Sequence, residues 1–82
     1  MYTSVTKDQI EERVFAALVE FGADPAEVAR HTAFERLDID SLDLVELAQI
    51  VEDEYGVQLK GDDLKELTTV GDAIDMVTAR VA

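Results

Sequence analysis

Hydrophobic residues recur along this chain every three or four positions, the spacing of one face of an α-helix. Near the N-terminus this face contains Ile10, Val14, Ala17, Leu18 and Phe21. Thr6 and Gln9 have the spacing of a capping box, and Gly22 follows the last hydrophobic member of the run. The pattern therefore predicts a helix over residues 6–21.

The most regular run follows Asp40. One helical face here contains Leu44, Leu47, Ala48, Val51 and Tyr55. Asp40 is a suitable N-cap, Asp43 is an acidic first-turn residue of the kind that the helix dipole favours, and Gly56 marks the end. We expect a helix that starts at Asp40 and ends before Gly56.

The remaining segments are less regular. Residues 22–39 contain two glycine or proline breakers and scattered hydrophobic positions, so they predict a long ordered connection, with one turn around Pro25–Ala29. Residues 61–67 can form a short helical turn, and Thr69 can cap a last helix. The hydrophobic face of that helix comprises Val70, Ala73, Ile74, Val77 and Val81.

Alternation typical of strands is absent, apart from a possible extended stretch at residues 57–59. The hydrophobic faces together predict an all-α fold, a small four-helix bundle of three longer helices and one short helix. Eighty-two residues suit one domain, so we expect residues 1–82 to form a single domain with a small core.

Charge narrows the range of partners. Nineteen acidic residues against seven Lys and Arg give a net charge of −12, which repels nucleic acids and anionic lipids and favours basic protein partners. Disorder is not expected, because 48% of the residues are hydrophobic and they are periodic. The chain shows no leader-like N-terminus and no apolar stretch approaching about 18 residues. We expect a soluble, cytoplasmic monomer that does not insert into membranes.

The sequence contains no cysteine, so disulfides, thiolate metal ligands and a cysteine nucleophile are excluded. Any thiol chemistry must come from a cofactor. A calcium loop starting at Asp38 fails because Leu42 and Gln49 occupy ligand positions. His31, the single histidine, has no nucleophile motif to support it and is interpreted as a polar loop or packing residue.

Asp40 and Asp43 could be a general acid and base, but a small acidic bundle offers little enclosure to shift their pKa values, and helix capping explains both. Ser41, between them, could be an ordinary hydroxyl at the start of a helix. Its position also suits a phosphodiester, since helix N-termini attract anions. Zinc spacings and phosphate-binding glycine loops are missing from the sequence.

Residues 40–46 read Asp-Ser-Leu-Asp-Leu-Val-Glu, which closely resembles the D-S-L-x-x-V-E motif of acyl carrier proteins. Glu52-Asp53-Glu54-Tyr55-Gly56-Val57 is similar to the acidic end of that family's second helix. Residues 68–74, Thr-Thr-Val-Gly-Asp-Ala-Ile, are similar to the start of its last helix. The resemblance extends over essentially the whole chain.

The resemblance implies a carrier that is not itself an enzyme. In the family, a phosphopantetheinyl transferase that uses magnesium moves 4′-phosphopantetheine from coenzyme A to a serine, which here is Ser41. The arm ends in a thiol that holds an acyl group as a thioester. Acyltransferases, ketosynthases and other enzymes of fatty-acid or polyketide-type synthesis are the implied partners.

The resemblance also implies two surfaces. Docking of basic partner patches is expected at Asp38, Asp40, Leu42, Asp43, Val45, Glu46, Glu52, Asp53 and Glu54. A groove for the acyl chain is expected among Leu47, Val51, Leu59, Leu64, Leu67, Ala73 and Val77, all of which core packing could equally explain.

Three positions depart from the family pattern. Asp38 stands where glycine is common, Lys60 where proline is common, and Gln49 where a methionine often makes a hydrophobic partner contact. Two other functions stay open at this point. One is an aminoacyl or peptidyl carrier that uses the same arm, and the other is an acidic helical interaction module without an arm.

Overall fold

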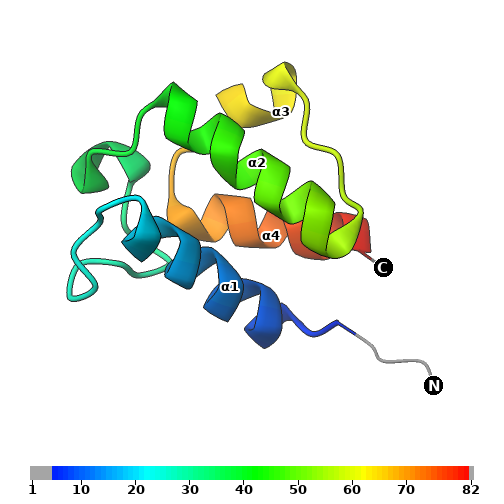
Figure 1. Cartoon of the computed structure of the whole chain (residues 1–82), viewed down its shortest axis with the longest axis horizontal. Helices are drawn as coiled ribbons and strands as arrows, with labels where there is room; N and C mark the ends of the chain where they lie inside the picture. The colour runs from blue at the N-terminus through cyan, green and yellow to red at the C-terminus, as the bar shows by residue number, and fades with distance from the viewer. Residues whose placement is uncertain (1–4, 82) are drawn as a thin grey trace.

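The computed structural model describes residues 5–81 of the chain. The elements, in order, are α1 (Lys7–Glu20), η1 (Phe34–Leu37), α2 (Ser41–Tyr55), α3 (Gly61–Lys65) and α4 (Val70–Val81). Helix α1 packs against both α4 and α2, and α3 lies at the edge of the bundle near the start of α2 (Figure 1). Within residues 5–81 no strand forms, which confirms the all-α bundle of three longer helices and one short one.

The predicted capping residues start the helices. Gln9 donates its backbone N–H to the Thr6 hydroxyl at 3.2 Å, and the Thr6 N–H donates to the Gln9 side chain at 3.0 Å. At α4, the Asp72 N–H donates to the Thr69 hydroxyl, while the Asp72 carboxylate accepts from the N–H groups of Thr68 and Thr69. Each reciprocal pair satisfies first-turn donors that a helix cannot satisfy internally, so both boundaries were predicted to within one residue.

The core lies where the hydrophobic faces of α1, α2 and α4 meet. Its largest fully buried side chains are Ile10, Val14, Leu18, Val51, Ile74 and Val77, with Val70. The connection between α1 and α2 adds Ala23, Phe34, Leu37 and Ile39 to the same cluster. The scattered hydrophobic positions of residues 22–39 are therefore core anchors, and they hold the connection against the bundle.

Backbone hydrogen bonds fix the same connection to the start of α4. The Phe34 N–H donates to the Thr68 carbonyl, and Val70 N–H donates to the Thr32 carbonyl at 2.9 Å. Gly71 N–H donates to the Arg30 carbonyl at 2.7 Å. Ala33 and Thr69 thus form an isolated antiparallel bridge. This anchoring sets the path by which the chain reaches α2.

The connection contains one element that the sequence did not predict. A turn does form at Pro25, where Glu27 N–H donates to the Asp24 carbonyl, as expected for proline after an aspartate. The helical turn, however, is η1 at Phe34–Leu37. Four residues are too few to show a helical period, so the sequence pattern gives no signal for η1, whose first and last residues are both buried. The stretch at residues 57–59 forms no strand.

Candidate functional site

Ser41 is the first residue of α2 and is exposed. The approach to it is anchored by Leu37 and Ile39, which are both buried. Asp38 lies between them in the left-handed region, with φ of 58°, where most side chains are strained but aspartate is tolerated better. Glycine adopts this conformation without strain, which agrees with its frequency at this position in the family that the sequence resembles. The serine is therefore presented to solvent from a rigid base.

A reciprocal cap surrounds the serine. Asp43 N–H donates to the Asp40 carboxylate at 3.0 Å, and Asp40 N–H donates to the Asp43 carboxylate at 3.3 Å. Leu44 N–H donates to the Asp40 carbonyl. Of the first-turn N–H groups, those of Ser41 and Leu42 are left for solvent or an anion, because a helix supplies no internal partner there. Asp40 and Asp43 are thus capping groups, as the sequence predicts.

Beside Ser41 is a pocket of about 300 Å³ between α2 and α3. Its lining comes from two matching helical faces: Ser41, Leu44 and Val45 of α2, and Gly61, Leu64 and Lys65 of α3. Each set has the i, i+3, i+4 spacing of one helix face. We call this the Ser41 pocket. Its mostly apolar lining can shelter hydrophobic groups attached at the serine.

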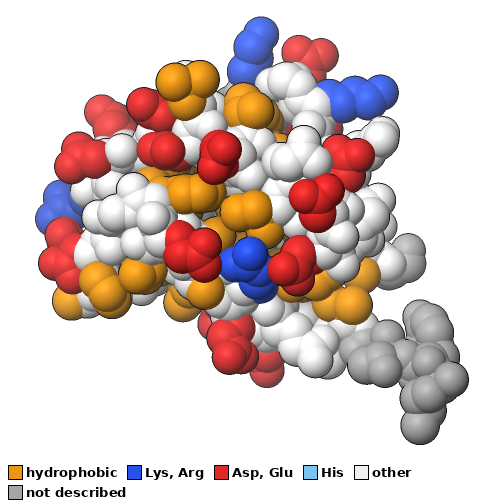
Figure 2. Space-filling view, in the orientation of Figure 1, with side chains coloured by type: hydrophobic (Ala, Val, Ile, Leu, Met, Phe, Trp, Pro, Cys, Tyr) orange, Lys and Arg blue, Asp and Glu red, His pale blue; other side chains and the backbone are white. Residues whose placement is uncertain are grey.

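The outer face of α2 combines acidic and apolar side chains. Leu42 is 76% exposed and Val45 is 55% exposed, both unusual for large hydrophobic residues. Acidic side chains are spread across the face shown in Figure 2, with hydrophobic side chains exposed among them. Such a surface fits a partner that offers basic residues around an apolar contact.

The predicted docking residues differ in what else they contact. Asp38, Asp40, Glu46, Glu52, Asp53 and Glu54 are exposed, and Asp43 is half-buried. The Glu54 carboxylate accepts from Arg13 of α1 at 3.0 Å, and the Asp53 carboxylate accepts from Gln49 at 3.1 Å. Glu46 and Glu52 make no hydrogen bond to another side chain within the described residues. Of the predicted acidic docking residues, Glu54 alone forms an ion pair within the described residues.

The predicted groove residues do not all lie together. Leu47, Val51, Leu67, Ala73 and Val77 are buried in the core, while Leu59 and Leu64 are half-buried. Leu64 alone of these seven lines the Ser41 pocket. Sequence reasoning did not name Leu44, Gly61 or Lys65 as pocket residues, although the i+3 step from Ser41 to Leu44 was available as a signal.

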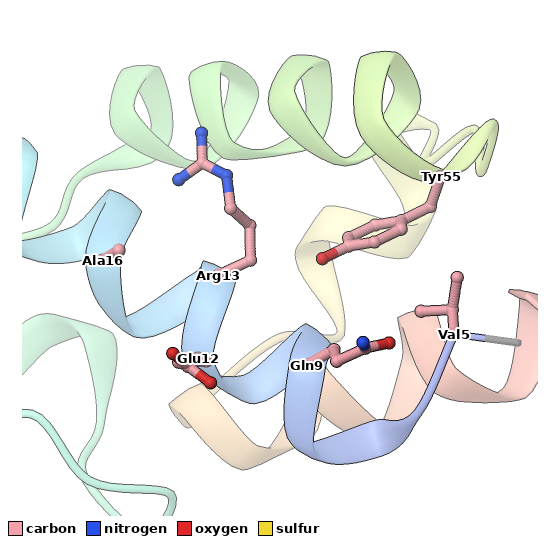
Figure 3. Close-up of a pocket in the computed structure, with 6 residues that line it drawn as sticks. All are labelled: Val5, Gln9, Glu12, Arg13, Ala16 and Tyr55. Atoms are coloured by element: carbon pink, nitrogen blue, oxygen red, sulfur yellow. The ribbon is translucent and has the colours of Figure 1, made fainter. Parts of the chain in front are cut away.

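A second pocket, of about 410 Å³, lies between α1 and the end of α2, where Tyr55 extends over Gln9 and Val5 (Figure 3). It is about 20 Å from Ser41 along α2, at 1.5 Å per residue. Its cation, Arg13, already pairs with Glu54. Burial, followed by the nearby Glu54 carboxylate, raises the pKa of Tyr55, so the phenol stays protonated near neutral pH. Neither Arg13 nor Tyr55 is therefore a free reactive group in this pocket.

Comparison with known proteins identifies the family. The profile described as the phosphopantetheine attachment site matches residues 12–77. The chain belongs to the acyl carrier protein family. The meromycolate extension acyl carrier protein of Mycolicibacterium smegmatis is 43% identical over 70 residues, which are 78% of this chain and 71% of that relative. Its counterpart in Mycobacterium leprae is 38% identical over 73 residues, 82% of this chain and 64% of the relative.

This acyl carrier protein is a carrier and not an enzyme, and its cofactor is a covalently attached 4′-phosphopantetheine. The site fits that group, because Ser41 is exposed at a helix N-terminus and adjoins an apolar pocket. Membership of the family implies work with a phosphopantetheinyl transferase and with synthase enzymes. Between residues 5 and 81 no helix is long and apolar enough to cross a membrane.

Proposed function

We propose that Ser41 is the residue to which the phosphopantetheine arm is attached. The supporting observation is its geometry: an exposed hydroxyl on the first residue of α2, inside the matched segment and beside the Ser41 pocket. The Ser41 oxygen forms an ester bond to the pantetheine phosphorus of coenzyme A. The pyrophosphate bond breaks, adenosine 3′,5′-bisphosphate leaves, and the hydroxyl proton passes to the transferase or to water.

The arm supplies a thiol, which this cysteine-free chain lacks, to hold an acyl group as a thioester. We propose that the cargo is an acyl chain undergoing extension in fatty-acid-type synthesis. Support comes from relatives named for meromycolate extension, among them that of Mycobacterium tuberculosis, which is 40% identical over 70 residues. That match covers 78% of this chain and 61% of the relative. Polyketide-type synthesis is the alternative with the same thioester chemistry.

The outer face of α2 is proposed to dock acyltransferases and ketosynthases through their basic patches. Glu46 and Glu52 supply charge there, and Leu42 and Val45 supply the apolar contact. Such charges mainly raise the rate of encounter, so docking should weaken as salt increases. We propose that the chain acts as a monomeric, single carrier domain in the cytoplasm, where coenzyme A is available and thiols stay reduced.

Intact mass spectrometry after incubation with coenzyme A and a broad-specificity phosphopantetheinyl transferase tests the attachment residue. The chain has only two serines, Ser4 and Ser41, which provide a matched pair of variants. Wild type and Ser4→Ala should gain one phosphopantetheine, and Ser41→Ala should gain none. Mass gain by Ser41→Ala would refute the assignment.

Loading of the modified protein then tests the cargo. A malonyl or acyl transferase should form a thioester, and an adenylating enzyme supplied with amino acids should not. Efficient aminoacyl loading without acyl loading would favour a peptidyl carrier. No mass gain by wild type would instead favour an interaction module without the arm.

A further inference from the structure

Four of the seven basic residues already form ion pairs. Lys7 pairs with Asp75, Arg30 pairs with Glu11 and Asp75, Arg13 pairs with Glu54, and Arg80 pairs with Asp63. Arg36, Lys60 and Lys65 form no ion pair within residues 5–81. Of these three, Lys65 is the one that lines the Ser41 pocket. An uncommitted cation in so acidic a protein is available for a ligand.

The orientation of α3 places Lys65 on the same pocket as Ser41. Gly61, Leu64 and Lys65 form the face of α3 that lines the Ser41 pocket. Asp63 lies outside this face and is held by Arg80 of α4 through two contacts of 2.8 and 2.9 Å. Because the opposite side of this short helix is fixed to α4, Lys65 stays on the side of the pocket.

The surroundings of Ser41 are otherwise acidic. Asp38 and Asp40 are exposed, and Asp43 is half-buried in the cap. A phosphodiester on Ser41 adds another negative charge to this group, and like charges repel. Lys65 is the only cation that lines the pocket within the described residues, so it is positioned to offset that repulsion.

We propose that the Lys65 ammonium binds the phosphodiester attached to Ser41 and so holds the start of the arm against the Ser41 pocket. The inference rests on the proposed attachment at Ser41. It predicts that the effect of modification on the stability of the protein depends on Lys65, even when the arm has no acyl group. The same ammonium could instead meet a carboxylate at the end of a malonyl cargo, and the experiment separates these two anions.

The experiment compares wild type, Lys65→Met and Lys60→Met, each in unmodified, modified and malonyl-loaded form, with mass spectrometry confirming modification at Ser41. Lys60 is the control, because it is an exposed lysine on the neighbouring segment that does not line the pocket. Modification should favour the folded state of wild type and of Lys60→Met more than it favours that of Lys65→Met. The difference should be about threefold in the unfolding equilibrium constant, the size of one exposed ion pair.

Phosphorus NMR gives the direct readout. The phosphodiester resonance of modified Lys65→Met should differ from those of wild type and Lys60→Met. That difference should disappear at about 1 M salt, where the Debye length is about 3 Å. The inference is overturned if the modified proteins have identical phosphorus resonances and modification stabilises all three equally. It is also overturned if Lys65→Met differs from wild type only when the arm carries malonyl cargo. Both outcomes leave attachment at Ser41 intact. A failure to modify Ser41 overturns both the inference and the attachment.

Discussion

Arg80 and Asp63 form a two-point ion pair in which guanidinium Nη1 lies 2.9 Å from Oδ2 and Nη2 lies 2.8 Å from Oδ1. Arg80 also donates to the Gln58 carbonyl at 3.3 Å. Helix α3 contains no fully buried residue and packs against the core through half-buried Leu64, so this fork adds a second attachment, to the end of α4. The position of one wall of the Ser41 pocket therefore depends in part on a residue of α4.

Acid should weaken this contact. The Arg80 side chain, followed by the Lys60 backbone N–H, lowers the pKa of Asp63 from 3.8 to about 2. The unfolded chain therefore binds more protons than the folded one between about pH 4 and pH 2, so the stabilisation is complete above this range and is lost as pH falls through it. Replacing Arg80 by methionine should lower stability at pH 7 and flatten this dependence.

Urea unfolding of wild type and Arg80→Met between pH 7 and pH 2 measures the effect. The gap between their unfolding free energies should narrow as the pH approaches 2. Arg36→Met is the control, because Arg36 is exposed and forms no ion pair within residues 5–81. A gap of constant size across this range would show that Arg80 acts by packing alone.

Gly71 marks the tightest approach between the long connection and α4. A Cβ at this position would lie 2.8 Å from the Arg30 carbonyl oxygen, to which the Gly71 N–H already donates. The obstacle is backbone, so Gly71→Ala should displace the connection and destabilise the protein by about 1–3 kcal/mol. Gly61→Ala is the matched control, because its Cβ meets nothing within 4 Å. Thermal unfolding measures both variants, and a melting temperature of Gly61→Ala equal to or lower than that of Gly71→Ala would contradict this geometry.

The helices were predictable because their signals are local. The Thr6–Gln9 and Asp40–Asp43 pairs are spaced for capping, and the apolar faces repeat over several turns. Element η1 and the anchoring of Arg30 and Thr32 to α4 were not predictable, since they depend on pairing between segments far apart in sequence. The only sequence signal for the left-handed backbone at Asp38 is that Asp38 stands where the family commonly has glycine.

The candidate site was predictable only in part: the serine and its cap follow from the sequence, but the pocket beside them does not. Ser41 and its flanking aspartates stand in one short motif, so their proximity follows from helix geometry. The pocket beside Ser41 also needs α3, whose placement depends on Arg80. The sequence pattern therefore indicates Leu64, but five of the other six groove positions are residues buried in the core, because an inward-facing hydrophobic residue looks the same in both roles.

Asp40 offers a way to separate helix capping from partner docking. Its carboxylate accepts the Asp43 N–H, and its charge also lies on the proposed docking surface. Asp40→Asn keeps an acceptor and should retain nearly full stability, whereas Asp40→Ala should cost about 1 kcal/mol. Both should slow association with the transferase at low salt, because both remove the charge.

Urea unfolding and stopped-flow association kinetics, measured on the same three proteins, check this pair of effects. Asp8→Asn is a suitable charge control, since it removes an exposed acidic group in the first turn of α1 that forms no ion pair within residues 5–81. If Asp40→Asn associates as fast as wild type, Asp40 is a cap without a docking role.

Gly61 provides a test of where an acyl chain rests. It lines the Ser41 pocket, and a side chain added there meets no atom within 4 Å at its Cβ, so Gly61→Leu should fill the pocket without unfolding the protein. Each methylene sheltered from water contributes up to about 0.8 kcal/mol. Octanoyl-loaded wild type should therefore be more stable than acetyl-loaded wild type, and Gly61→Leu should lose most of that gain. Urea unfolding of both loaded forms measures it, with Gly61→Ala as the smaller step. An undiminished gain in Gly61→Leu would place the chain among core residues such as Val51 and Val77 instead.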